Sequence, residues 1–368
     1  MHESLRVNLG NGYSIWTGTG FLEESCIVDF CKKQANFFVI ITDSNLVALY
    51  GNTLQKRFKK SELLCHLLSF SGGDANKTRK TKQMLEDRMF SLKCGRDTCI
   101  IALGGGVVSD LAGFIASTYC RGVPAVYVPT TLLAMVDASI GGKTGINTVF
   151  GKNLVGTFYQ PAAVFMDLIS LKTLPKREFK NGMVEMIKHG LIADAKVFMQ
   201  LKKNLKKMKK SDSTFAEEMI IRSCEIKKEI VERDEKEKGE RSLLNFGHTI
   251  GHAIESVEEY KITHGEAVAI GILVESFISY KLGILQEKTI KEIRDIFDIY
   301  EIPLVLNQPF NMEKLKKSLK LDKKAIKNSA RFVLLEDIGK PHYSNTGYTS
   351  EVPDEILNES ILWMQENF

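Results

Sequence analysis

Hydrophobic patterning changes once along this chain, near residue 174, and this change limits the available folds more than any other feature. Before that point, three short apolar runs are bounded by polar or turn-forming residues, as buried parallel strands are: 37–42, 97–103 and 125–128. Residues 76–90 and 110–120 precede the second and third runs and are long enough for crossover helices. The pattern predicts a Rossmann-like α/β domain over residues 1–173, of the kind that binds nucleotides.

After residue 174, apolar residues recur at three- and four-residue spacing, and strand-like alternation nearly vanishes. The segments with this spacing are 177–209, 214–234, 248–260, 265–282 and 287–300. We therefore expect an all-α domain over residues 174–368.

Composition excludes several classes of protein. The 368 residues are 44% hydrophobic and 26% charged, which suits two globular domains better than a disordered chain. The net charge of +5 lies mainly in Lys202–Lys210, where the lysines are opposite an apolar helical stripe, so a solvated helix face is favoured over a nucleic-acid patch. No apolar run is long enough to span a bilayer. The seven cysteines show no metal-pair spacing, and we expect a cytoplasmic protein with reduced thiols that binds neither nucleic acid nor membrane.

A glycine-rich turn follows the second apolar run, at Gly104–Asp110. Glycines at a strand-to-helix turn let backbone N–H groups approach a pyrophosphate, although this spacing differs from the usual dinucleotide fingerprint and a plain tight turn is an equal alternative. Asp43 directly follows the first apolar run, where a carboxylate favours NAD over NADP; it could equally cap a helix.

Residues 129–156 are dense in glycines, hydroxyl groups, lysines and amides. We expect one irregular region there that forms a polar pocket for an anionic, hydroxylated ligand.

The helical half contains a candidate metal site. Glu185 and Lys188 lie three residues apart, His248 and His252 share a helix face at four-residue spacing, and His264 precedes another helix. A Glu and two His ligands with open coordination positions are typical of catalytic Zn²⁺. Spacing alone favours His248 and His252 as the ligand pair, and two core or capping histidines remain the alternative.

These blocks together resemble the 3-dehydroquinate synthase family over most of the chain, from residue 37 to about residue 339. The matching blocks are 104–110, 129–147, 151–161, 177–190, 224–255, 264–266 and 322–324. The resemblance implies an NAD-binding α/β domain, a helical metal-binding domain and a homodimer. The implied activity converts 3-deoxy-D-arabino-heptulosonate 7-phosphate to 3-dehydroquinate and phosphate, in the shikimate pathway.

The resemblance also implies roles for individual residues, and it replaces His252 with His264 in the ligand set. The implied ligands of Zn²⁺ or Co²⁺ are Glu185, His248 and His264. The implied substrate and phosphate contacts are Asp137, Lys143, Asn153, Lys188, Lys227, Arg241, Asn245, His252 and Lys323, with Arg121 reaching the partner subunit's site. The implied NAD contacts are Asp43, Asp74, Lys77, Gly105, Gly106, Val107, Asp110, Thr130, Thr131, Lys143, Lys152, Thr173 and Glu178.

Two positions depart from the family pattern, and both concern NAD. Asp74 stands where Glu is usual, and Ser170 stands where an aromatic residue is usual.

Three other functions stay open: another sugar-phosphate cyclase, a metal-dependent polyol dehydrogenase, and an inactive NAD or metal sensor. The simple dehydrogenase is disfavoured because it needs no cluster of cations around a phosphate.

Overall fold

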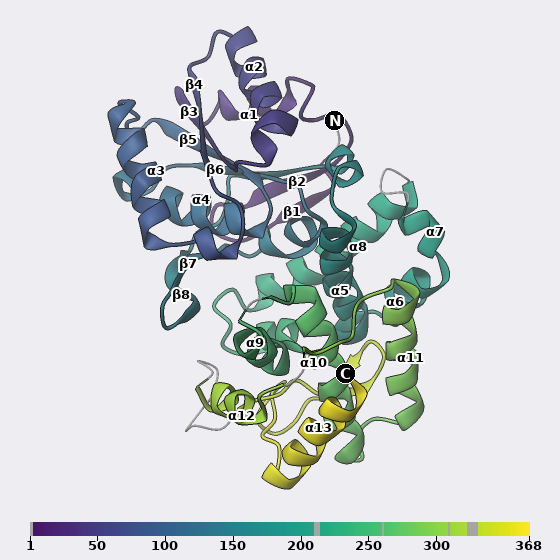
Figure 1. Ribbon diagram of the computed structural model, residues 1–368. Helices are drawn as coiled ribbons and strands as arrows, with labels where there is room; N and C mark the ends of the chain where they lie inside the picture. Colours follow the sequence, from purple (N-terminus) through teal and green to yellow (C-terminus); the bar gives the residue numbers. More distant parts are fainter. Residues whose placement is uncertain (1–2, 210–213, 260, 308–309, 322–329) are drawn as a thin grey trace. The chain divides into compact units, whose positions relative to one another are not determined.

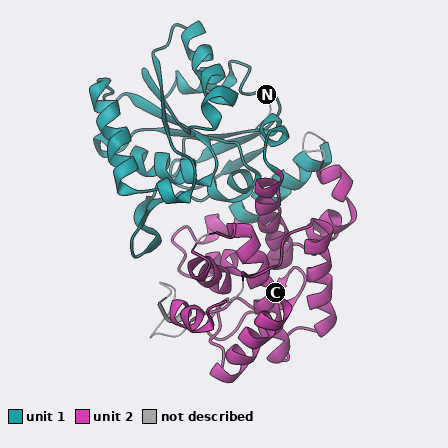
Figure 2. Cartoon of the chain, viewed as in Figure 1, with its two compact units in different colours: residues 1–175, 210–228 teal, residues 176–209, 229–368 magenta. Residues whose placement is uncertain are grey.

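The computed structural model describes residues 3–209, 214–259, 261–307, 310–321 and 330–368. Contacts within it define two compact units: residues 1–175 with 210–228, and residues 176–209 with 229–368 (Figure 2). Helix α8 (Thr214–Arg233) contributes residues to both units. The domain boundary after residue 173 stays a prediction, because a later segment groups with the first unit.

The first unit is built on a seven-stranded sheet (Figure 1), in the order β1-β2-β9-β6-β5-β3-β4. Only β1 is antiparallel, and it pairs with β2 at one edge. The strands are β1 (Leu5–Val7), β2 (Tyr13–Gly18), β3 (Phe37–Asp43), β4 (Cys65–Phe70), β5 (Thr98–Gly104), β6 (Ala125–Pro129) and β9 (Ala163–Asp167). The helices are α1 (Cys26–Cys31), α2 (Asn52–Lys60), α3 (Arg79–Ser91) and α4 (Gly106–Thr118).

Strands β3, β5 and β6 confirm the three predicted strands, and α3 and α4 confirm the predicted crossover helices. Every residue of β5 is buried, which explains why its sequence is a continuous apolar run rather than an alternating one. Ile40, Ile101 and Val126 belong to one core cluster, and each such side chain stabilises the fold by roughly 1.5–3 kcal/mol. Strands β1, β2, β4 and β9 were not predicted.

The expectation of one irregular region over residues 129–156 is wrong in its second half. Strands β7 (Lys143–Thr148) and β8 (Gly151–Phe158) form an antiparallel hairpin there. Its glycines permit close packing of the two backbones: a Cβ atom at Gly156 would lie 1.9 Å from the Thr144 carbonyl oxygen. The glycines that suggested a loop are therefore required by a tight strand pair.

The second unit is mainly helical, as predicted. Its helices are α5 (Lys176–Ala193), α6 (Ala195–Lys203), α7 (Leu205–Met208), α9 (His248–Val257), α10 (His264–Lys281), α11 (Glu287–Ile299), α12 (Met312–Leu321) and α13 (Asp354–Asn367). A small hairpin, β10 (Leu335–Asp337) with β11 (Lys340–Pro341), was not predicted, and neither were α12 and α13. The predicted helix over 177–209 divides into three. The first break is at Asp194, which is extended and whose carboxylate accepts from the N–H groups of Lys196 and Val197; the second is at Asn204, whose backbone is not helical.

Three further expectations can be compared with the structure. Phe198, Leu201 and Met208 are buried, and Lys203, Lys206, Lys207 and Lys209 are exposed, which confirms the solvated lysine face over residues 203–209. Lys202 is half-buried, with Nζ 3.2 Å from Asp295 Oδ2, Leu205 is half-buried, and Lys210 lies outside the described residues. The seven cysteines are free thiols, as expected. Among the described helices, none combines the length and the apolar character that a bilayer span requires.

Candidate metal centre and ligand-binding residues

The glycine-rich turn joins β5 to α4, as predicted. Gly105 precedes the helix in an extended conformation, and the helix begins at Gly106. The N–H groups of Val108 and Ser109 already bond to the Gly105 carbonyl oxygen, at 3.0 Å each. The N–H groups of Gly106 and Val107 lie earlier in this first turn, at the positive end of a 13-residue helix, a position that favours an anionic ligand.

Other predicted NAD contacts lie at the carboxyl ends of neighbouring parallel strands. Asp43 ends β3, and its Oδ1 accepts from the Asn45 N–H group at 2.8 Å; the next helical turn begins only at Val47, so Asp43 does not cap a helix. Thr130 directly follows β6 and is 3% exposed. Its hydroxyl oxygen has no hydrogen-bond partner among the described residues, as a ligand-binding group would in a ligand-free protein. Thr131 caps the following turn through the Ala134 N–H group, at 3.1 Å.

Lys77 is the centre of a charged cluster of predicted NAD contacts. Its ammonium group lies 2.8 Å from Asp110 Oδ2 and 3.8 Å from Asp74 Oδ1. Lys152 Nζ lies 2.8 Å from the other Asp74 oxygen. Burial alone would raise the pKa of Asp74, but Lys152 and Lys77 outweigh it and lower that pKa below its usual value. Burial raises the pKa of Asp110, and Lys77 offsets only part of this increase.

The hairpin brings a predicted substrate contact to this cluster. Asn153 lies on β8 in a left-handed conformation, with φ of 55°, and its Oδ1 accepts from Lys77 Nζ at 2.6 Å. Lys143, the first residue of β7, is exposed. Elsewhere in this unit, Lys227 Nζ donates to both the carboxylate and the backbone carbonyl of Asp137. Two predicted substrate contacts therefore form an ion pair with each other.

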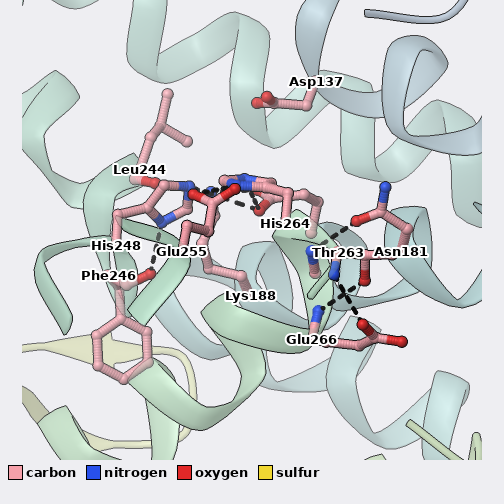
Figure 3. A network of polar contacts seen from close by, with 12 residues as sticks. Asp137, Asn181, Lys188, Leu244, Phe246, His248, Glu255, Thr263, His264 and Glu266 are labelled. Carbon is pink, nitrogen blue, oxygen red and sulfur yellow. Dashed lines mark hydrogen bonds and ion pairs between the residues drawn. The ribbon is translucent and has the colours of Figure 1, made fainter. Parts of the chain in front are cut away.

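The second unit places the three predicted metal ligands together. The ligand atoms of Glu185, His248 and His264 all lie within 4.8 Å of one another. Figure 3 shows His248 and His264 side by side, with Lys188 and Glu255 near them. Glu185 Oε1 lies 3.6 Å from His248 Nε2 and 3.7 Å from His264 Nε2. His248 Nδ1 lies 3.0 Å from the Phe246 carbonyl oxygen; if this nitrogen carries the proton, Nε2 is left as a ligand. One carboxylate and two imidazoles suit Zn²⁺ or Co²⁺.

His252 belongs to a second group of potential ligands, with Glu255 and His264. No group found among the described residues contains both His248 and His252, the pair that spacing alone favours. The His252 ring lies 5.3 Å from that of His248 and 5.9 Å from that of His264, measured between centroids. Burial would lower the pKa of His264, but Glu255 and Glu185 outweigh it and raise that pKa to about 10 in the metal-free protein. The surroundings therefore favour a positive charge at this position.

Three predicted substrate contacts are close in sequence to the predicted metal ligands and carry basic or amide groups: Lys188 follows Glu185, and Arg241 and Asn245 precede His248. Lys188 is 1% exposed and donates to Glu185 and, at 2.6 Å, to the Leu244 carbonyl oxygen. Arg241, also 1% exposed, donates to the Glu235 carbonyl oxygen. Asn245 Nδ2 donates to Glu237 Oε1 at 2.6 Å. The buried charge of Glu185 is thus compensated by its neighbour one helical turn along α5.

The remaining predicted residues are more scattered. Thr173 and Tyr50 share a hydrogen bond between their hydroxyl groups, and Glu178 Oε2 accepts from Asn181 Nδ2 at 3.2 Å. Arg121 is exposed, with φ of 71°. Ser170 is buried and donates to the Asp167 carbonyl oxygen at 2.7 Å. Lys323 lies outside the described residues.

Sequence reasoning missed residues that touch the predicted site residues without carrying a motif of their own. Glu255 lies beside His264, and Asn181 contacts the residue that follows His264. Asn147 accepts from the Asn153 N–H group at 3.1 Å and donates to the Asp74 carbonyl oxygen at 3.0 Å. All three lie within blocks that match the family, at 129–147, 177–190 and 224–255, and Glu255 also lies three residues after His252 on α9, but neither signal assigned them a role.

Two family models and several curated proteins match this chain. The family model for the 3-dehydroquinate synthase N-terminal region matches residues 67–181, and the model for the C-terminal region matches residues 182–325. A 3-dehydroquinate synthase of Shewanella halifaxensis is 41% identical over 364 residues, covering 98% of this chain and 99% of the relative. One of Nitrosomonas europaea is 40% identical over 367 residues, covering 98% and 97%.

Solved structures of two synthases share the fold. A 2-deoxy-scyllo-inosose synthase complexed with carbaglucose-6-phosphate, NAD⁺ and Co²⁺ has a TM-score of 0.84 at 27% identity, covering 97% of this chain and 98% of that one. The 2-epi-5-epi-valiolone synthase of Streptomyces hygroscopicus, with NAD⁺ and Zn²⁺ bound, has a TM-score of 0.87 at 25% identity, covering 97% of each chain. This chain belongs to the 3-dehydroquinate synthase family.

Proposed function

We infer that this protein is a phosphate-eliminating cyclase that converts 3-deoxy-D-arabino-heptulosonate 7-phosphate to 3-dehydroquinate and phosphate. It depends on NAD and a divalent metal and acts in the shikimate pathway. The observation that carries this function is the grouping of Glu185, His248 and His264 next to Lys188, in a chain about 40% identical to 3-dehydroquinate synthases over its whole length.

The residues present fit both groups that the reaction needs. Glu185, His248 and His264 offer the donor set of a catalytic Zn²⁺ or Co²⁺ site, and the buried hydroxyl of Thr130 beside a helix N-terminus fits a polar cofactor. When bound, NAD supplies a temporary acceptor for the substrate's hydride, and the metal supplies a Lewis acid that lowers the pKa of hydroxyl groups.

Three basic residues and one amide account for recognition of the phosphate. We assign phosphate binding to Lys143, Asn153, Lys188 and Arg241, whose N–H groups form charge-assisted or amide hydrogen bonds to oxyanions. Lys188 uses two of its three N–H donors within the protein, on Glu185 and the Leu244 carbonyl oxygen. Its third donor can serve the substrate, so the residue that neutralises a metal ligand also orients the reacting molecule.

The ion pair of Asp137 and Lys227 supports substrate binding in a different way. The carboxylate holds the ammonium group in one position before substrate arrives, which reduces the entropy lost on binding. We assign His252 to contact with the substrate and not with the metal, and Asn245 and Lys323 to the same set. Asp43, Asp74, Lys77 and Lys152 supply the polar contacts to NAD.

We further propose that the enzyme is a cytoplasmic homodimer. The seven free cysteines suit a reducing compartment. Arg121 is exposed, and its guanidinium group has no hydrogen bond or ion pair with any described residue, so its five N–H donors are available to a phosphate in a partner's site.

The substrate distinguishes this function from that of the other cyclases. Incubation with NAD, Co²⁺ and either the heptulosonate phosphate or a hexose phosphate, followed by identification of the carbocyclic product, tests it. We expect 3-dehydroquinate from the first substrate and no cyclised product from the second. A carbocycle formed only from the hexose phosphate would place this chain with the inosose synthases.

A further inference from the structure

Helix α5 contacts the start of α10 through side chains spaced four residues apart. Arg177 Nη2 lies 2.9 Å from Glu266 Oε2, Asn181 Oδ1 accepts from the Gly265 N–H group at 2.6 Å, and Glu185 Oε1 lies 3.7 Å from His264 Nε2. One face of α5 therefore contacts three consecutive residues of α10, and the two segments run in opposite directions: residues 177, 181 and 185 contact residues 266, 265 and 264. The last of the three contacts joins two proposed metal ligands.

Asn181 occupies the middle of this row and is the buried polar contact next to the metal centre. Asn181 is buried, with 8% of the residue exposed, whereas the side chain of Arg177 is 57% exposed. The backbones are also close here: a Cβ atom at Gly265 would lie 2.7 Å from both Asn181 oxygens. Arg177 and Glu266 form a second, partly exposed attachment through two N–H donors, and Asn181 is the buried one of the two.

The N-terminus of α10 needs this contact because its first N–H groups have no partners within the helix. A capping box between Thr263 and Glu266 satisfies two N–H groups: Thr263 Oγ1 accepts from Glu266, and Glu266 Oε2 accepts from Thr263 (Figure 3). Asn181 supplies the acceptor for Gly265, the residue directly after the ligand His264. Its Nδ2 group in turn donates to Glu178 Oε2, which fixes the orientation of the amide.

We propose that Asn181 is a positioning residue that fixes the start of α10 against α5 and thereby sets the separation between Glu185 and His264. The inference rests on the proposed metal site. Asn181 does not touch the metal or the substrate; it acts through the backbone of Gly265. Loss of the acceptor releases the first turn of α10, so the imidazole of His264 loses the fixed distance to Glu185 that tetrahedral coordination needs.

The test measures Co²⁺ binding to metal-free protein by competition with a chelator, together with the visible absorption of bound Co²⁺. Asn181→Ala should weaken Co²⁺ binding by about tenfold or more and change the absorption bands. Asn181→Asp keeps the acceptor for Gly265 but loses the bond to Glu178 and places two carboxylates together there, so it should bind Co²⁺ less tightly than wild type and more tightly than Asn181→Ala. Lys180→Ala is the matched control, because Lys180 is the neighbouring residue on α5 and, among the described residues, donates only to Glu301.

The outcomes separate this inference from the proposed function. A folded Asn181→Ala protein that binds Co²⁺ like wild type would overturn the inference alone, as would an aspartate variant as impaired as the alanine variant. A wild-type protein that binds no Co²⁺ would overturn the proposed function, and the inference with it. If Asn181→Ala does not fold, amide hydrogen exchange in metal-free wild type decides: the Gly265 N–H should be protected, and rapid exchange would contradict the proposal.

Discussion

Glu255 Oε2 lies 3.4 Å from Nδ1 of His264, while Nε2 of the same ring faces Glu185 Oε1 at 3.7 Å. The two ring nitrogens are thus directed to two different carboxylates. Glu255 is 2% exposed and lies on α9, and His264 is the first residue of α10. A carboxylate on the far nitrogen of a metal-binding histidine fixes the ring and makes it a stronger ligand.

Glu255→Gln should therefore weaken metal binding without abolishing it, by about tenfold. The amide preserves the size of the side chain but removes the charge that holds the imidazole. Chelator competition measures the affinity, and Glu258→Gln is the control, since Glu258 is a buried carboxylate close by that bonds to Asn307. If Glu255 were itself a ligand, in the group with His252, its variant would lose the metal while Glu185→Gln would retain it.

The choice between His264 and His252 gives a second prediction. His264→Ala should lose most of its metal, and His252→Ala should keep its metal and lose turnover, because the proposed ligand set contains only the first of these residues. Metal content of the purified variants, measured by atomic emission, decides. A metal-free His252→Ala protein beside a metal-loaded His264→Ala protein would support the ligand pair that spacing alone suggests.

The third prediction concerns the cofactor. Asp43 and Asp74 would place carboxylate charge near the ribose hydroxyl groups, which favours NAD and repels the additional phosphate of NADP. Titration calorimetry should show NADP binding at least about tenfold weaker, a difference of about 1.4 kcal/mol. The Asp74→Glu variant should retain or tighten NAD binding. Equal affinities for the two cofactors, or a large loss in Asp74→Glu, would contradict these assignments.

The fourth prediction tests a site shared between subunits. Arg121→Ala and Glu185→Ala homodimers should each be nearly inactive. A mixed dimer would collect both changes in one site and leave the other intact, so co-expression should recover up to about half of wild-type activity per mixed dimer. Isolated mixed dimers as inactive as their parents would mean that Arg121 acts within its own subunit or has no role.

Sequence patterns were informative where one physical requirement dominates. Buried parallel strands such as β5 must be apolar throughout, and helices with one buried face, such as α11, must repeat apolar residues at helical spacing, so both were predictable. Hairpin β7–β8 was not, because glycines needed for close backbone packing also mark loops. The break after Ala193 depends on one extended aspartate inside an otherwise helical pattern.

In the candidate site, too, some residues could be predicted from sequence patterns and others could not. Residues proposed to carry the chemistry, such as His264 and Lys188, occur in recognisable motifs. The residues that contact the start of α10 do so from other helices: Asn181 reaches Gly265 from α5, 84 residues earlier, and Glu255 reaches His264 from α9. Spacing along one helix favours His248 and His252, but no group of potential ligands among the described residues contains both, because residues four apart share a face whether or not both can reach the same point.

The most direct test of the function follows phosphate and NADH together in one reaction. Purified protein, NAD and Co²⁺ are mixed with the heptulosonate phosphate; phosphate is measured by a coupled assay and NADH by its absorbance. Because the hydride returns to the substrate before the product leaves, phosphate should be released over many turnovers while NADH does not accumulate. NADH formed in step with substrate consumption, without release of phosphate, would show a dehydrogenase and contradict the proposed reaction.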